Sequence, residues 1–398
     1  MSLPLLLFED ARASDLVPLT DLFAVPDLAF GGSSLGRRWA ARFGGAAFVE
    51  ARATAFAADP IARPSDPAGD VFVANAAALP GPWMQETLDR AGPALLVSGD
   101  RIVGARADAA RLRPGIGRGA GFAAFLEGLG LPRRDVDARV VAWAWQMVAW
   151  NTEALAEDLA GLRAERSGEI HDRAVLLRPE RIRVREGARI DPLAVLDARE
   201  GPILIGRDVI VAPHTVVTGP CAVRRGTQLL GGAIGRSTIG PGCRITGEVD
   251  DTLWQGWSNK RHHGFVGHSV IGEWSNLGAL TTTSDLKNNY GTVRAWAAGA
   301  ERDTGTIKLG AILGGGVKTG IGTLLPTGAV IGTGSHLFGG GRYAPKRLAA
   351  FSWWDGERTS EYRLDDYLAT LRTAMRRRGV TLAADQERAV RALHAARA

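Results

Sequence analysis

The chain has 398 residues, of which 45% are hydrophobic, and a formal net charge of +6. This length predicts two domains, and the hydrophobic content excludes general disorder. Arginine is spread along the chain, and its densest run, Arg376–Arg378, has no interleaved aromatic residues for base stacking, so no nucleic-acid partner is expected.

Two further features bear on the cellular compartment. Cys221 and Cys243 are too few for a disulfide framework and stand in no metal-ligand cluster, which favours a reducing cytoplasm. The apolar run Leu3–Phe8 lacks a basic leader and continues directly into Glu9, so it is expected to be a buried strand rather than a signal peptide. No stretch is long and apolar enough to span a bilayer, and no membrane partner is expected.

The first 160 residues alternate short apolar runs with helical patterns. This alternation is typical of an α/β domain with a largely parallel sheet. A longer apolar stripe predicts a helix over Val140–Leu162, which would bridge the two domains. The expected strands are Leu5–Phe8, Ala46–Val49, Val71–Ala74 and Ala94–Val97, and the expected shorter helices lie around Leu35–Arg42 and Pro82–Ala91.

From Val184 onward, apolar residues recur at every sixth position, with phase slips. Neither a helix nor a hairpin sheet has this period, whereas a triangular β-solenoid does, because each coil has three short faces separated by turns. Glycine follows several of these positions, as turns with unusual backbone angles require. The repeat therefore predicts a parallel β-helix. The alternative to a functional site on this β-helix is that it serves only as a structural spacer. The repeating residues are Val184, Ile190, Leu196, Ile205, Val211, Val217, Val223, Leu229, Ile239, Ile245, Ile271, Leu277 and Ile321.

Two segments, Leu253–Phe265 and Ser284–Arg302, interrupt the repeat. Insertions into a rigid frame are a usual place for functional residues. After Gly341 the repeat stops, and residues 360–398 have helical spacing. We expect this helix to cap the open end of the solenoid.

The stretch Asn259–Gly267, followed by Ile271–Ala279, resembles the acetyltransferase half of bacterial bifunctional N-acetylglucosamine-1-phosphate uridylyltransferase/glucosamine-1-phosphate acetyltransferases. Leu6–Asp10, Pro18–Thr20 and Leu286–Val293 make the chain more similar still to a shorter form of this family, described as sugar nucleotidyltransferases. The resemblance extends over essentially the whole chain and is most specific in residues 250–295.

The resemblance implies three parts. These are a nucleotidyltransferase-like α/β domain over 1–160, a left-handed parallel β-helix of hexapeptide repeats over 161–345, and a helical tail over 346–398. It also implies acetyl transfer from acetyl-CoA to an amino-sugar 1-phosphate, with nucleotidyl transfer from UTP or dTTP by the first domain, for which Mg²⁺ is a candidate cofactor. A homotrimer is expected because hexapeptide acyltransferases place their sites between neighbouring solenoids.

Site residues follow from the resemblance one by one. His262 would be the general base that takes a proton from the sugar amine, a task that suits imidazole because it changes charge near neutral pH. Asn276 would orient the amine or the acetyl group, or else belong to a structural asparagine ladder. The backbone N–H near Ala279 would stabilise the oxyanion, a contribution of about 3–4 kcal/mol. The residues that would hold the sugar or its phosphate are Lys260, Phe265, Asn289, Tyr290, Arg224 and Arg225. The other histidines singled out, His214, His263, His268 and His336, are interpreted as structural or incidental.

The sequence departs from the family in two places. The coil that carries a phosphate-binding lysine in the bifunctional enzymes is here the acidic stretch Gly247–Asp251, which would repel a phosphate but could hold an amine or a hydroxyl. The usual phosphate-binding loop after the first strand is absent. Asp10 and Arg12 stand there as candidates for nucleotide contacts, followed by Asp100, while the Gly-rich stretch Gly31–Arg38 is a weak phosphate signal.

The leading hypothesis is therefore a cytoplasmic transferase of sugar-nucleotide synthesis. One alternative is a sugar-1-phosphate nucleotidyltransferase whose β-helix only assembles the oligomer. The other is a non-catalytic protein that binds sugar nucleotides, with both sites decayed.

Overall fold

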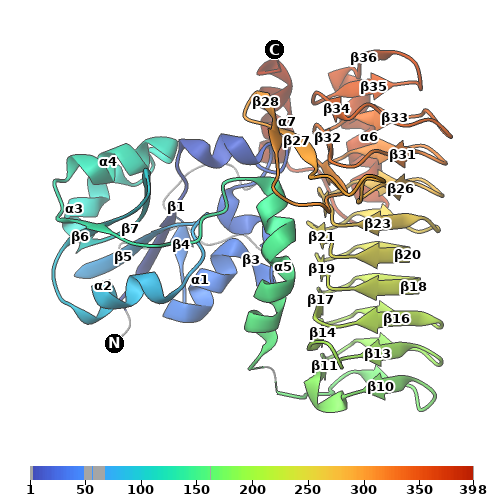
Figure 1. The fold of residues 1–398 in the computed structure, drawn as a ribbon, viewed down its shortest axis with the longest axis horizontal. Helices are drawn as coiled ribbons and strands as arrows, with labels where there is room; N and C mark the ends of the chain where they lie inside the picture. Colours follow the sequence, from blue (N-terminus) through green and yellow to red (C-terminus); the bar gives the residue numbers. More distant parts are fainter. Residues whose placement is uncertain (1–2, 49–55, 57–67, 162, 398) are drawn as a thin grey trace. The chain divides into compact units, whose positions relative to one another are not determined.

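The computed structural model describes residues 3–48, 56, 68–161 and 163–397, and the chain divides into two compact units (Figure 1). The first unit is an α/β fold and the second is a tall stack of coils. The N-terminal unit comprises Met1–Leu16, Phe23–Leu28 and Ser34–Trp143, and the C-terminal unit comprises Val17–Leu22, Ala29–Ser33 and Ala144–Ala398.

The N-terminal unit is built on a six-stranded sheet with the order β4-β1-β5-β7-β6-β8, in which only β7 runs antiparallel to the others. Alternate residues of β1 and β5 enter two separate buried clusters, since Leu7 and Phe72 pack on one side and Leu6 and Val73 on the other. A sheet covered on both faces explains the continuous apolar runs, and the predicted largely parallel sheet is confirmed. The strands are β1 (Leu5–Phe8), β4 (Ala47–Phe48), β5 (Asp70–Asn75), β6 (Ala94–Ser98), β7 (Arg101–Asp108) and β8 (Arg133–Asp135), and two short strands, β2 (Ala29–Phe30) and β3 (Ser33–Ser34), precede β4 in the chain.

Short helices accompany this sheet. The backbone N–H of Arg37 donates to the Ser34 hydroxyl at the start of α1, and Gly44, in the left-handed region, ends it. The predicted helix around Leu35–Arg42 is therefore confirmed, while the one over Pro82–Ala91 is a 3₁₀ turn continued by a short helix. The helices are α1 (Leu35–Phe43), α2 (Gln85–Asp89), α3 (Ala109–Leu112) and α4 (Phe122–Gly128), with 3₁₀ turns at Ala11–Leu16, Val25–Asp27, Pro82–Met84, Arg113–Gly115 and Gly119–Gly121.

The continuous part of the C-terminal unit begins with α5 (Ala144–Leu159). The sequence predicts this helix from Val140, but Val140 forms an antiparallel bridge with Ala78 and belongs to the N-terminal unit. Leu162, the predicted end, lies outside the described residues. A short 3₁₀ turn at Pro179–Arg181 lies in the first coil that follows.

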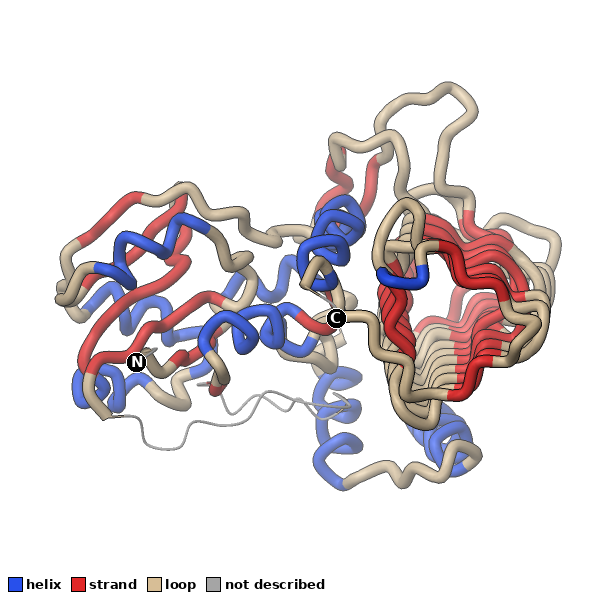
Figure 2. Tube along the Cα trace, turned by 90° about the horizontal axis from the view of Figure 1, so that it is seen from below, coloured by secondary structure: helices blue, strands red, loops and turns tan. Residues whose placement is uncertain are grey.

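The coils that follow form three parallel faces, and successive coils superpose when seen along the stack (Figure 2). This architecture fits a left-handed β-helix. The first face consists of β11 (Ile182–Val184), β14 (Ile203–Ile205), β17 (Cys221–Val223), β19 (Thr238–Ile239), β21 (Leu253–Trp254), β24 (Val270–Ile271), β29 (Ala311–Leu313), β32 (Ala329–Ile331) and β34 (Arg347–Leu348).

Two long strands, β18 (Gln228–Gly235) and β20 (Arg244–Asp250), turn the corner between the other two faces. The second face contains their first residues together with β9 (Glu169–Ile170), β12 (Arg189–Ile190), β15 (Ile210–Val211), β22 (Asn259–Lys260), β25 (Asn276–Leu277), β30 (Lys318–Thr319), β33 (His336–Leu337) and β35 (Ser352–Trp354), which pairs antiparallel with β36 (Thr359–Glu361). The third face contains their last residues together with β10 (Val175–Leu177), β13 (Val195–Asp197), β16 (Thr215–Thr218), β23 (Phe265–Gly267), β26 (Thr282–Thr283) and β31 (Leu324–Leu325).

The period of six corresponds to inward-facing side chains, and every predicted repeat residue except Ile321 is buried. Ile321 is 72% exposed, so its assignment to the repeat is wrong. In that part of the stack the residues spaced by six that point inward are Leu313, Thr319 and Leu325. Because one of these inward positions holds a threonine instead of an apolar residue, the apolar residues alone do not reveal the register of this coil.

Leu253–Phe265, predicted to leave the solenoid, instead forms β21, β22 and the start of β23. Its inward residues, Trp254, Lys260 and Val266, keep the spacing of six and are all fully buried. The segment resembled a break in the repeat because one of its inward residues is a lysine rather than an apolar residue. Ser284–Arg302 is an insertion as predicted, and it carries the β27 (Arg294–Ala297)–β28 (Ala300–Asp303) hairpin.

The tail forms two helices as expected, α6 (Leu364–Arg376) and α7 (Ala384–Ala395). However, α6 packs along the side of the stack rather than over its open end. Tyr367 contacts Phe351, and its hydroxyl lies where a side chain at Gly316 would be. The apolar stripe of α6 explains this position, because Leu368, Leu371 and Met375 are buried with Tyr367.

Candidate functional site

Polar residues of the N-terminal unit converge at the carboxyl ends of β1 and β5. Asp10 follows β1, and its carboxylate accepts two hydrogen bonds from Arg101, of 2.7 Å from Nε and 2.9 Å from Nη2. Asn75, the last residue of β5, donates to the same carboxylate at 2.8 Å. The Asp10 and Arg101 side chains are only 11% and 6% exposed. This is a buried bidentate ion pair of the kind that fixes geometry.

The carboxyl ends of β1 and β5 also lie where the strand order of the sheet reverses. From β1 the chain goes to β4 on one side of the sheet and then to β5 on the other, so strand order reverses between β1 and β5. In open α/β sheets, ligands bind at the carboxyl ends of the strands at such a switch point. Arg12 pairs with Asp100 beside it, and the hydrogen bond from Arg12 lowers the pKa of Asp100. The structure thus brings together Asp10, Arg12 and Asp100, and adds Arg101 and Asn75, which sequence reasoning missed.

In the C-terminal unit, His262 and Asn276 line the same cavity, which has a volume of about 720 Å³. The cavity lies between the second face and α6. Its floor is a ladder of outward-facing residues from successive coils, in the order Arg244, Asn259, Asn276 and Lys318. The Asn259 side-chain amide donates to Oδ1 of Asn276 at 2.8 Å, so Asn276 belongs to an asparagine ladder and also faces the cavity.

His262 stands at the corner that leads from β22 to β23, and its side chain is exposed. Gly264, two residues later, has a φ of 132°, and a Cβ there would lie 2.3 Å from the Thr281 carbonyl oxygen. Only glycine fits this close approach, which holds the His262 corner against the next coil.

Lys260 does not reach this cavity. Its side chain is fully buried inside the stack, where the ammonium donates to the carbonyl oxygens of His262 at 2.8 Å and Thr246 at 3.2 Å. A lysine in this position does not suit the contact with a sugar phosphate that the resemblance implies. It fixes the backbone of the His262 corner instead.

Lys260→Met is expected to remove part of the pH dependence of stability. Burial lowers the pKa of Lys260 to about 8 in the fold, against 10.5 for an ordinary lysine. Between these values the unfolded chain binds more protons than the folded chain. The free energy of unfolding of the wild type should therefore rise with pH relative to the variant, by up to about 1.4 kcal/mol per pH unit. Urea unfolding across this window measures the difference.

Below pH 8 both states hold the lysine charged, so the difference between wild type and variant should be constant there. Lys308→Met supplies the control, because it removes a lysine from an exposed position and so separates the burial of Lys260 from the loss of a lysine as such. Parallel curves for the wild type and Lys260→Met would contradict the predicted burial of the charge.

The remaining predicted residues lie apart from the cavity. Ala279 is in the turn after β25, where its carbonyl accepts from the Gly322 N–H at 2.8 Å. Phe265 packs against Gly267 on the third face. Asn289 and the 69% exposed Tyr290 occupy the inserted loop. The two arginines follow β17 several coils earlier, where Arg224 donates to the Gly32 carbonyl at 2.8 Å and the Arg225 carbonyl accepts from the Gly242 N–H.

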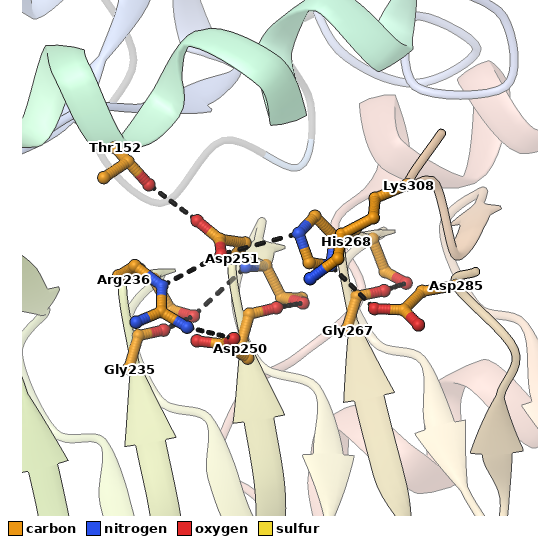
Figure 3. Close-up of polar contacts among 12 residues, drawn as sticks. Thr152, Gly235, Arg236, Asp250, Asp251, Gly267, His268, Asp285 and Lys308 are labelled. Atoms are coloured by element: carbon orange, nitrogen blue, oxygen red, sulfur yellow. Dashed lines mark hydrogen bonds and ion pairs between the residues drawn. The ribbon is translucent and has the colours of Figure 1, made fainter. Parts of the chain in front are cut away.

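A third cluster surrounds His268 at the end of the third face (Figure 3). Its Nδ1 lies 2.7 Å from Oδ2 of Asp285, and its Nε2 lies 3.5 Å from Oδ2 of Asp251. Burial by itself would raise the pKa of Asp285, but the hydrogen bond and charge of His268 lower it below its usual range. The sequence carried a signal for this cluster, because Asp251, His268 and Asp285 are each 17 residues apart, the length of one coil here.

The acidic coil is part of this cluster. Arg236 pairs with both Asp250 and Asp251, and the Thr152 hydroxyl of α5 donates to Asp251 at 2.7 Å. Both carboxylates therefore already have a cation, and they do not present the free acidic pair that the sequence indicated for an amine or a hydroxyl.

Among the described residues, no group of three or more His, Cys, Asp or Glu side chains is placed to hold a metal ion. Both cysteines are buried and free. None of the helices in the described ranges combines the length and apolar character needed to cross a bilayer.

Three comparisons with known proteins give matches. The similarity to the crystal structure of the BC4754 gene product of Bacillus cereus, provisionally assigned as an acetyltransferase, covers 94% of that chain and 58% of this one, with 13% identity and a TM-score of 0.21. A bifunctional sugar-1-phosphate nucleotidylyltransferase/acetyltransferase of Sulfurisphaera tokodaii is 34% identical over 93 residues, which are 23% of each protein. Residues 5–167 match the family model described as sugar nucleotidyl transferase.

Proposed function

We propose that the chain is a transferase of sugar-nucleotide synthesis whose β-helix acetylates an amino-sugar 1-phosphate. The sugar amine attacks the thioester carbonyl of acetyl-CoA, so that a C–N bond forms and the C–S bond breaks. His262 takes the proton that the amine loses and passes it to the departing CoA thiolate. Asn276, which lines the same cavity, orients the amine or the acetyl group.

One observation carries this proposal: His262 and Asn276, 14 positions apart in the sequence and on successive coils, line one cavity. The cavity is large enough for a small substrate and has cationic side chains around it, as a sugar phosphate requires. The likeness to the bifunctional protein of Sulfurisphaera tokodaii supports the pairing of acetyl transfer with nucleotidyl transfer.

For the N-terminal unit we propose nucleotidyl transfer from UTP or dTTP to the sugar 1-phosphate. The family match over residues 5–167 supports this step. The half-exposed Arg12 at the switch point supplies a cation for a phosphate, and the buried Asp10–Arg101 pair fixes the geometry beside it. We propose that the protein acts in the cytoplasm as a homotrimer, in which neighbouring solenoids complete the acetyl-transfer sites.

Thiol release tests the acetyl transfer. The full-length protein is incubated with acetyl-CoA and glucosamine 1-phosphate, and then with a panel of other amino-sugar phosphates. Thiol release that depends on the sugar supports the proposal. Release with none of the sugars contradicts acetyl transfer, and pyrophosphate release from UTP or dTTP in the same preparation would then identify a nucleotidyltransferase whose β-helix is a scaffold.

A further inference from the structure

The cavity between the second face and α6 is strongly cationic, and we call it the basic groove. Its lining includes five positively charged residues and no Asp or Glu from the described part of the chain. Two of the cations come from the ladder on the floor, one from the His262 corner, and two from the residues that directly follow α6. They are Arg244, Lys318, Arg261, Arg377 and Arg378.

The floor has a regular spacing, because each ladder residue lies one coil above the previous one. Neighbouring parallel strands are roughly 4.8 Å apart, so Arg244 and Lys318 lie at opposite ends of a floor that extends over three such steps. Asn259 and Asn276 lie between the two cations, and their mutual hydrogen bond leaves one amide oxygen and one amide nitrogen facing the groove. The floor therefore presents cation, amide, amide and cation in series.

These charges are not neutralised by the protein. No ion pair with a described acidic residue is formed by any of the five. Arg244 Nε is buried without a hydrogen-bond partner among the described residues. Burial lowers the pKa of Arg378 below its ordinary value, and the charges of Arg244 and Arg377 lower it further. Gathering like charges without counter-ions costs free energy in the empty protein, and an anion in the groove would offset that cost.

The walls keep the groove open and rigid. The residues of α6 that face the floor are small, Ala369, Thr370, Thr373 and Ala374. On the other side, the Trp257 and Trp274 rings stack with centroids 5.2 Å apart. Trp257 also covers Gly242, where a Cβ would meet the ring at 2.6 Å. One face of each tryptophan ring is therefore covered by the other ring.

We propose that the basic groove binds a ligand through a diphosphate group. Five cations along the length of the groove exceed what one phosphate requires, and the volume of about 720 Å³ admits a ligand larger than an inorganic ion. A diphosphate occurs at the nucleotide end of CoA, in a nucleotide sugar, and as free pyrophosphate. The inference rests on the same cavity as the proposed acetyl transfer, but it concerns binding and can be tested without turnover.

Calorimetric titration of the full-length protein with pyrophosphate, CoA and UDP-N-acetylglucosamine tests the proposal. We expect Arg377→Gln and Arg261→Gln, both at exposed positions, each to weaken diphosphate binding about tenfold or more, because each removes a charge-assisted hydrogen bond. Arg376→Gln is the matched control, since Arg376 is the neighbour of Arg377 on α6 but does not line the groove. The Arg376→Gln variant should bind the diphosphate compounds with the same affinity as the wild type.

A second variant guards against misfolding as an explanation. Ala374→Glu places a carboxylate among the five cations, and it should abolish diphosphate binding while raising the thermal unfolding midpoint. No binding of any of the three compounds by the wild type at millimolar concentration would overturn the proposal, as would equal losses in Arg376→Gln and Arg377→Gln. If the wild type binds more than one of the compounds, the compound with the highest affinity identifies the source of the diphosphate. Failure of acetyl transfer alone would leave this result standing.

Discussion

His262→Ala is expected to lower acetyl transfer to the amino-sugar phosphate about 10²- to 10⁴-fold, the usual contribution of a positioned general base. Without the imidazole, the proton of the attacking amine has no acceptor in the cavity floor, which consists of amides and cations. The loss should appear in kcat, because the side chain acts on the proton rather than on the phosphate. Steady-state thiol release at saturating acetyl-CoA measures it.

His263 provides the control for this prediction. It is exposed on the same corner, but it does not line the cavity, so His263→Ala should retain activity and stability. His262→Ala should also keep the diphosphate affinity of the basic groove. Equal activity in the wild type and His262→Ala would show that His262 is not the general base, and equal losses in the two histidine variants would point to damage of the corner rather than to proton transfer.

Arg101→Met is expected to lower the free energy of unfolding of the N-terminal unit by about 3–5 kcal/mol. The substitution leaves the Asp10 carboxylate buried without its cation, and the partners that remain are the Asn75 amide and the Arg12 backbone N–H. Urea unfolding, followed by a tryptophan signal of this unit, measures the change. The same variant should lose nucleotidyl transfer if the switch point holds the nucleotide.

The double variant Asp10→Asn/Arg101→Met separates charge from packing. Because it removes both members of the pair, it should recover part of the stability that Arg101→Met loses. Arg12→Ala breaks only the exposed ion pair with Asp100, so it should change the free energy of unfolding little. A small effect of Arg101→Met together with a large one of Arg12→Ala would reverse the assigned roles of the two arginines.

Much of the fold could be predicted from the sequence. The spacing of six identified the β-helix because the inward position of each face must be apolar, and twelve of the thirteen predicted repeat residues are buried. The prediction failed where an inward position is polar. Lys260 can be buried because two backbone carbonyls accept from its ammonium, and Thr319 because its hydroxyl lies 2.7 Å from that of Thr281. Such compensation depends on neighbouring coils and leaves no trace in a local pattern.

The candidate site divides in the same way. The sequence by itself determined the architecture, since period and alternation are properties of consecutive residues, and it singled out His262, Asn276, Asp10 and Arg12. Only the tertiary structure decided which side chains share a space. Arg377 directly follows α6, more than 100 positions from Asn276, and the groove exists because the apolar stripe of α6 packs on the stack. Likewise, Arg101 at the start of β7 reaches Asp10 after β1 across the intervening strand β5. Contacts between distant elements are set by packing. The packing free energy depends on residues of both elements together, so it cannot be inferred from either stretch of sequence alone.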